Sequence, residues 1–140
     1  MEKQIRYTLK KDERLKSRKL IEQLFKDGET FSSFPIRVIY SFTLPALSSS
    51  ANILQTGFGV STKNFKKAVD RNRIKRLLRE SYRLQKNELA EQVKLKDKKL
   101  VIFFMFNGKE LPDHKLIYDK VQKGIQRLQK IMNEDISSNT

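Results

Sequence analysis

The sequence predicts an α+β protein, a two-layer sandwich in which helices pack against one small mixed sheet. Two patterns carry this prediction. Apolar residues recur at helical spacing near both ends and in the middle of the chain. Between these segments lie short runs rich in β-branched and aromatic residues, which are typical of strands. The resulting order is α-β-β-α-β-α, or α-β-β-(β)-α-β-α if a third strand precedes the middle helix, and we expect a single domain over residues 1–140.

The first helix is predicted over residues 15–26. Its apolar residues recur at helical spacing, and Gly28 stands where a C-terminal cap belongs. A strand over residues 34–44 follows, because alternate residues are apolar and would share one face of a sheet. The apolar positions are Leu20, Ile21, Leu24 and Phe25 in the helix, and Ile36, Val38, Tyr40 and Phe42 in the strand.

A Ser-rich loop over residues 45–52 separates this strand from the next one, which is predicted over residues 53–61. Two glycines in the second strand, Gly57 and Gly59, carry no side chain. They leave room for another group to approach the backbone.

A basic helix comes next, starting between Asn64 and Arg71 and ending near Glu88. Residues 100–106 are all apolar, as expected for a strand that is covered on both faces. Asp113 is a suitable N-cap for a last helix. The inward positions of that helix are predicted to be Ile117, Val121, Ile125, Leu128 and Met132.

The composition indicates a soluble, cytoplasmic protein with a polyanionic partner. Lys and Arg outnumber Asp and Glu by 30 to 16, which gives a net charge of +14 and a pI near 10.1. The chain has no cysteine, which excludes disulfides and thiolate metal sites. No apolar run suggests a signal peptide or a membrane span. The polar ends, residues 1–12 and 133–140, are expected to be flexible.

Much of the positive charge lies in one segment, since residues 61–86 hold ten Lys or Arg and two acids, a net charge of +8. At about 100° per residue, an apolar arc faces the core and most cations lie opposite. Arg71 and Arg73 point in nearly opposite directions, and we place Arg71 at the N-terminal end of the helix. From charge alone, a solvated face and a nucleic-acid site both stay open. A membrane-surface helix is less favoured, because the only aromatic at the arc is Tyr82. The arc consists of Ile74, Leu77, Leu78 and Ser81, and the outward set of Asn72, Lys75, Arg76, Arg79, Arg83 and Lys86, with Arg73 at its flank.

The sequence offers no constellation for protein-based catalysis. His114 is the only histidine, and nothing around it supports a nucleophile–base pair. The chain has no Gly-rich phosphate loop. Paired carboxylates occur at residues 12–13 and 134–135, in ends that are expected to be flexible, where they make poor acid–base or metal sites. Any catalysis should therefore take its chemistry from another molecule.

The middle of the chain contains the run KNFKKAVDRNRIKRLLRESYR, residues 63–83. This run closely resembles the R-N-R signature of the bacterial ribonuclease P protein subunit. Residues 14–16 and 24–28 are similar to the first helix of that family, and residues 57–61 match the strand before the signature. The resemblance extends over about residues 14–132.

The resemblance implies a protein cofactor for a catalytic RNA. In this family the RNA subunit, with bound Mg²⁺, cleaves the 5′ leader from precursor tRNA. The protein would therefore belong to an endoribonuclease while supplying no catalytic residue and binding no cofactor by itself. Its partners would be the RNase P RNA and precursor tRNA, and the free protein would be a monomer. The implied fold is a small α/β sandwich with a left-handed βαβ crossover, which the usual right-handed rule does not predict.

Two sets of site residues follow from the family's motifs. The signature helix docks on the RNA, and a cleft between the first helix and the sheet holds the single-stranded leader. The glycine-containing strand would let the leader cross the sheet. Ile21 stands where many members carry an aromatic residue, which shifts base stacking to Phe25, Tyr40 or Phe58. The docking residues would be Lys66, Lys67, Arg71, Asn72, Arg73, Lys75, Arg76, Arg79 and Arg83, and the cleft residues Phe25, Arg37, Val38, Tyr40, Gly59 and Lys63.

Two other functions stay open from the residues alone. A structured-RNA-binding protein of ribosomal or chaperone type would need the basic helix but no exposed aromatic cleft. A DNA-binding module of this size would commonly bind as a dimer, and the sequence shows no obvious dimer seam. Phe25 and Tyr40 could also be ordinary core residues. A solvent-accessible groove that contains both side chains is therefore the expectation that the structure tests.

Overall fold

The computed structural model of the chain describes residues 9, 13–43, 54–96 and 98–138. The predicted Ser-rich loop over residues 45–52 lies outside the described residues, as do residues 1–8, 10–12 and 139–140. The elements are α1 (Arg18–Asp27), β1 (Glu29–Ser33), β2 (Ile36–Thr43), β3 (Leu54–Val60), α2 (Ala68–Gln85), α3 (Asn87–Leu95), β4 (Lys99–Phe106) and α4 (His114–Ser138).

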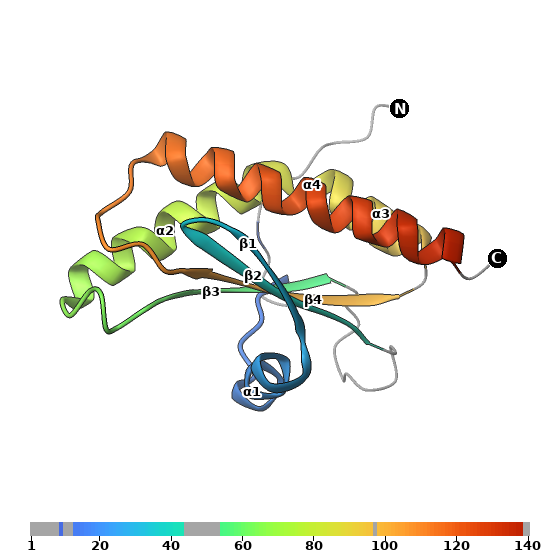
Figure 1. The fold of residues 1–140 in the computed structure, drawn as a ribbon, viewed down its shortest axis with the longest axis horizontal. Coiled ribbons are helices and arrows are strands. Elements are labelled where there is room, and N and C mark those ends of the chain that lie inside the picture. The colour runs from blue at the N-terminus through green and yellow to red at the C-terminus, as the bar shows by residue number, and fades with distance from the viewer. Residues whose placement is uncertain (1–8, 10–12, 44–53, 97, 139–140) are drawn as a thin grey trace.

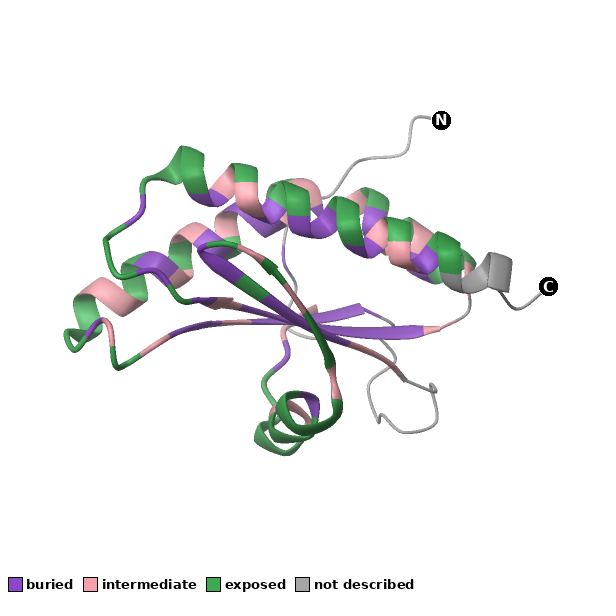
Figure 2. Ribbon diagram, viewed as in Figure 1, coloured by how far each residue is buried: buried purple, intermediate pink, exposed green. Residues whose placement is uncertain are grey.

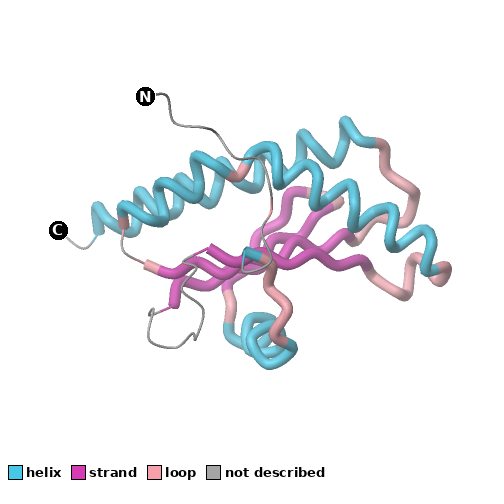
Figure 3. The backbone as a smooth tube through the Cα atoms, turned by 180° about the vertical axis from the view of Figure 1, so that it is seen from behind, coloured by secondary structure: helices cyan, strands magenta, loops and turns pink. Residues whose placement is uncertain are grey.

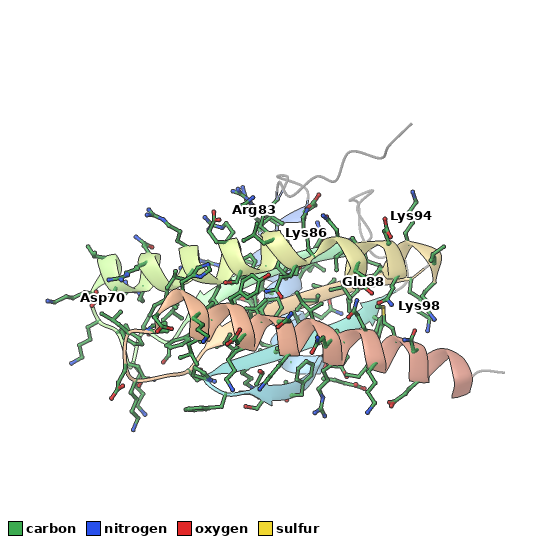
Figure 4. All side chains as sticks on the ribbon, turned by 90° about the horizontal axis from the view of Figure 1, so that it is seen from above. Asp70, Arg83, Lys86, Glu88, Lys94 and Lys98 are labelled. Carbon is green, nitrogen blue, oxygen red and sulfur yellow. The ribbon has the colours of Figure 1, made fainter. Side chains whose placement is uncertain are left out.

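The strands form one mixed sheet in the order β1-β2-β4-β3. β1 and β4 both pair antiparallel with β2, whereas β3 runs parallel to β4. A parallel neighbour requires a long crossover, and α2 and α3 supply it between β3 and β4. Seen from the side of these helices, the crossover turns in the left-handed sense that the family resemblance implied (Figures 1 and 4).

The sheet separates two unequal helical layers. α2, α3 and α4 lie over one face, and α1 lies against the other (Figures 1 and 3). The predicted α+β class is therefore confirmed. α2 and α4 also pack against each other, and both turn buried residues towards the sheet and exposed residues outward (Figure 2).

β4 is buried on both faces, as its continuous apolar run predicted. From Lys99 to Phe104 no residue is more than 7% exposed. Because successive side chains of a strand alternate between faces, Ile102 and Phe104 pack on the side of α2 and α4, and Val101 and Phe103 pack under α1. Full burial of one such side chain contributes about 1.5–3 kcal/mol. The inward residues predicted for α4 are also all buried, namely Ile117, Val121, Ile125, Leu128 and Met132.

α1 has defined caps at both ends. The hydroxyl of Ser17 accepts a hydrogen bond from the Leu20 N–H at 3.3 Å, and the Gly28 N–H donates to the Leu24 carbonyl at 2.8 Å. A Cβ atom at Gly28 would lie 2.5 Å from that carbonyl oxygen. The predicted cap position is therefore one where the chain has no room for a side chain.

Two elements had no separate signal in the sequence. The polar strand β1 exists because it pairs with β2, where Glu29 lies opposite Tyr40. α3 starts directly after α2, and Lys86 lies at the break between them. Lys86 was predicted to point outward, but it is buried and forms an ion pair with Glu13. The partner comes from a distant part of the chain, which helical periodicity cannot reveal.

The described parts of both chain ends belong to the fold. Leu9, in the segment predicted to be flexible, is buried in the main core. α4 continues to Ser138, several residues past the start of the predicted flexible tail. None of the described helices is long and apolar enough to span a membrane.

Candidate nucleic-acid interface

The outer side of α2 carries the predicted cations. Ile74, Leu78, Ser81 and Tyr82 are buried against the rest of the protein, so the opposite side of the helix faces outward. Figure 4 shows Arg83 on the side of α2 that is turned away from α4. We call this side the basic face of α2, and it consists of the exposed Asn72, Arg73, Arg76 and Arg79 and the partly exposed Lys75 and Arg83.

A buried hydrogen bond to β3 holds α2 in this orientation. The Thr56 hydroxyl on β3 donates to the Tyr82 hydroxyl at 2.8 Å, and both groups are buried. Burial raises the pKa of the Tyr82 phenol, which stays protonated in the core. On the outer side, Arg83 forms an ion pair with Glu80 at 2.6 Å. The buried bond fixes which side of α2 is inward and therefore which cations are outward.

The segment before α2 is fixed by its own hydrogen bonds. The Asn64 side chain donates to the carbonyls of Asn107 and Gly108 at 3.2 and 3.3 Å. One guanidinium nitrogen of Arg71 donates to the carbonyls of Phe65 and Lys66 at 2.8 and 2.7 Å. Arg71 thus lies at the helix N-terminal end, as predicted, but part of its bonding capacity holds the entry loop. The loop presents exposed lysines beside the N-terminus of α2, whose dipole favours anions: Lys63, Lys66 and Lys67.

A second surface lies on the face of the sheet that carries α1, and we call it the α1-side surface. Strand pairing puts Arg37, Met105 and Gly59 in one row across β2, β4 and β3. Arg37 is exposed and Met105 is partly exposed, so α1 leaves these two positions open, whereas Gly59 is buried. Beside it, Phe25 of α1 is 44% exposed and packs edge-on against Phe103 of β4, with ring centroids 5.0 Å apart. The surface therefore combines one exposed aromatic ring with a nearby cation.

Two predicted cleft residues lie on the opposite face of the sheet. Val38 is fully buried and Tyr40 is 6% exposed, both in the core with Phe104. The prediction that Phe25 and Tyr40 line one solvent-accessible groove is therefore wrong. Both faces of β2 carry apolar residues, so either face could pack against α1. The sequence therefore did not determine which face of β2 lies under α1.

The glycines of β3 also have a different role from the predicted one. A Cβ atom on Gly57 would lie 2.8 Å from a ring carbon of Phe103, and a Cβ on Gly59 would lie 2.8 Å from two others. The space above these glycines is thus filled by the Phe103 ring and not left for another molecule. Phe103 lies buried beneath the α1-side surface and Met105 is partly exposed on it. The continuous apolar run of β4 did not indicate either role.

The hydroxyl of Tyr40 donates to the Glu29 carboxylate at 2.8 Å. Burial and this acidic neighbour raise the pKa of Tyr40 from 10.0 to about 12. The neutral phenol is thus favoured in the folded protein, and this contribution to stability is complete below pH 10 and is lost as the pH rises towards 12. We expect Tyr40→Phe to flatten the fall of the unfolding free energy over this range, measured by urea denaturation. An equal fall in both proteins would contradict this assignment.

The described residues contain no group of three or more His, Cys, Asp or Glu side chains placed to hold a metal ion. His114 is exposed at the start of α4 and stacks on Tyr118, with ring centroids 5.9 Å apart. The side chains of the basic face of α2 and of the α1-side surface can bind anions, and the Phe25 ring can stack on planar rings.

Comparison with known proteins identifies the family. A family model described as Ribonuclease P matches residues 9–129. The chain is 35% identical over 122 residues to a ribonuclease P protein component of Porphyromonas gingivalis, covering 87% of each chain. It is 39% identical over 82 residues to the corresponding protein of Chlorobium phaeobacteroides, covering 59% of this chain and 56% of that one. The fold matches the Staphylococcus aureus RNase P protein with a TM-score of 0.61 at 18% identity, over 86% of this chain and 97% of that one. The sequence signature, the fold and these relatives agree that the chain belongs to the ribonuclease P protein family.

Proposed function

We propose that this chain is the protein subunit of ribonuclease P, which docks on the RNA subunit through the basic face of α2 and contacts the 5′ leader of precursor tRNA through the α1-side surface. Its family consists of protein components of a ribonucleoprotein endoribonuclease that forms mature tRNA 5′ ends. The observation that carries the docking assignment is the outward position of the signature cations on a helix fixed to the core.

Docking on RNA would use phosphate contacts. Each Lys or Arg that neutralises a phosphate releases counterions, which makes binding strong and dependent on salt. Arginine also offers two parallel N–H groups to one phosphate. The basic face of α2 places three arginines, Arg73, Arg76 and Arg79, on the exposed side of one helix. The entry-loop cations Lys66 and Lys67 extend this surface past the helix N-terminus.

Leader binding would use a different chemistry. Single-stranded RNA presents unstacked bases, which bind to exposed aromatic rings beside cations. Phe25 offers such a ring, and Arg37 and Lys63 are exposed cations that could meet the backbone. Val38 and Tyr40 are withdrawn from the leader-contacting set, because they lie in the core on the far face of the sheet.

The chemistry of cleavage is assigned to the RNA subunit with its Mg²⁺, as the resemblance to the ribonuclease P protein family implies. The protein's share is to bind and orient the two RNA molecules. The proposal also includes a monomeric free protein and a cytoplasmic location. A structured-RNA binder without a role in cleavage would account for the basic face of α2, but not for membership in this family.

A reconstitution tests the proposed function. The protein is mixed with the RNase P RNA from the same cell, and cleavage of precursor tRNA is followed at low Mg²⁺. We expect the protein to restore cleavage that the RNA alone performs poorly under these conditions, because added cations reduce repulsion between the two RNA molecules. A protein that binds this RNA tightly and leaves cleavage unchanged would be a plain RNA binder.

Replacing His114 by alanine should leave cleavage by the reconstituted holoenzyme nearly unchanged. The imidazole is exposed and stacks on the ring of Tyr118, which is not an arrangement typical of acid–base catalysis. The measurement is kcat on precursor tRNA, with RNA affinity measured in parallel. A fall of several hundred-fold at normal affinity would contradict the assignment of the chemistry to RNA.

A further inference from the structure

We infer that Phe103 is a positioning residue for leader binding, because it holds the exposed ring of Phe25 in the orientation that accepts a base. This inference rests on the proposed leader contact of Phe25 and adds the residue that determines its geometry. Phe103 itself is 7% exposed, so it acts through Phe25 and not by direct contact.

The contact between the two rings is specific. Their centroids lie 5.0 Å apart and their planes meet at 62°, an edge-to-face arrangement that aromatic pairs prefer. Phe25 lies in the last turn of α1. The residue that α1 buries is Leu24, so the helix itself does not enclose the Phe25 ring. Phe103 therefore limits the positions that this ring can take.

Phe103 is in turn held from below. Gly57 is its register partner on β3, and a Cβ atom there would lie 2.8 Å from one ring carbon of Phe103. A Cβ on Gly59 would lie 2.8 Å from two further ring carbons. The ring thus lies across both glycines, and any side chain at either position would lift it towards α1.

The consequence for binding is preorganisation. A base that stacks on a mobile ring must also immobilise it, and the lost conformational entropy of the ring makes the binding free energy less favourable. A ring already fixed by Phe103 avoids that loss. The glycines are therefore required because they make room for the residue that fixes the platform.

The test measures dissociation constants of the reconstituted holoenzyme for precursor tRNA and for mature tRNA. The variants are Phe25→Ala, Phe103→Leu and the double substitution. We expect Phe25→Ala to weaken precursor binding by about five- to a hundred-fold, the range of one stacked base. Phe103→Leu should produce a large part of that loss, and mature tRNA should bind as before. In the double variant the losses should not multiply, because both act through the same ring.

Val101→Ala is the matched control, since Val101 is a buried residue on the same face of β4 and in the same small core cluster. It should lower thermal stability without weakening precursor binding. Gly57→Ala displaces the Phe103 ring without changing Phe103, and should reproduce the Phe103→Leu effect. If Phe103→Leu fails to fold, Phe103→Met replaces it with a flexible side chain.

The outcomes separate the two claims. If Phe25→Ala leaves precursor binding unchanged, the proposed leader contact fails. If Phe25→Ala weakens precursor binding while folded Phe103 variants do not, the leader contact stands and the inference about Phe103 is wrong. Losses in the double variant that multiply, or that affect mature tRNA equally, would likewise assign Phe103 a purely structural role.

Discussion

Replacing Arg73 and Arg76 together by alanine weakens binding of the protein to RNase P RNA by about a hundredfold, since each lost charge-assisted contact costs at least about 1.5 kcal/mol. Both side chains are exposed on α2, and alanine is a better helix former than arginine. The far-ultraviolet circular dichroism and the melting temperature should therefore stay close to those of the parent protein. The affinity is measured by filter binding or fluorescence over a series of salt concentrations.

The salt series separates docking from general attraction. Each lost phosphate contact should lower the slope of log K against log salt by roughly one unit. The matched control is Lys115→Ala with Lys123→Ala, which removes the same charge from exposed positions on α4. If the control weakens binding as much as the arginine pair, the basic face of α2 is not a distinct docking surface.

Tyr40→Ala destabilises the protein by about 3–5 kcal/mol, the usual cost of removing a large aromatic side chain from a core. The residue is buried between Phe31 and Phe42, whose ring centroids lie 5.9 and 6.0 Å from its own. Urea denaturation of the free protein measures the loss. Phe25→Ala should have a much smaller effect in the same experiment, because Phe25 is 44% exposed whereas Tyr40 is 6% exposed.

In RNA binding the order of the two variants should reverse, so that Phe25→Ala has the larger effect. At a temperature where both are folded, Phe25→Ala should weaken precursor binding, and Tyr40→Ala should bind precursor and mature tRNA like the parent protein. Tyr40→Phe retains the ring and serves as the control for packing. A folded Tyr40→Ala variant that selectively loses precursor binding would return Tyr40 to the leader path and contradict the burial described above.

The character of α2 could be derived from the sequence alone. A helix repeats every 3.6 residues, so apolar positions such as Ile74 and Leu78 fix which side is buried and hence where Arg73, Arg76 and Arg79 point. β4 and α4 were predictable for the same reason. A strand such as β4 that is apolar at every position must be covered on both faces. A helix such as α4 with apolar residues along one side must bury that side.

Tertiary structure decided what periodicity leaves ambiguous. A strand with apolar residues on both faces can meet α1 with either, and packing placed Ile39 under α1 and Tyr40 under α4. Partners distant in the sequence determined the role of Lys86, which pairs with Glu13. The same holds for the β3 glycines, which accommodate Phe103 of β4. A local pattern shows whether a side chain prefers burial or exposure, whereas the identity of its neighbours depends on which segments the chain brings together.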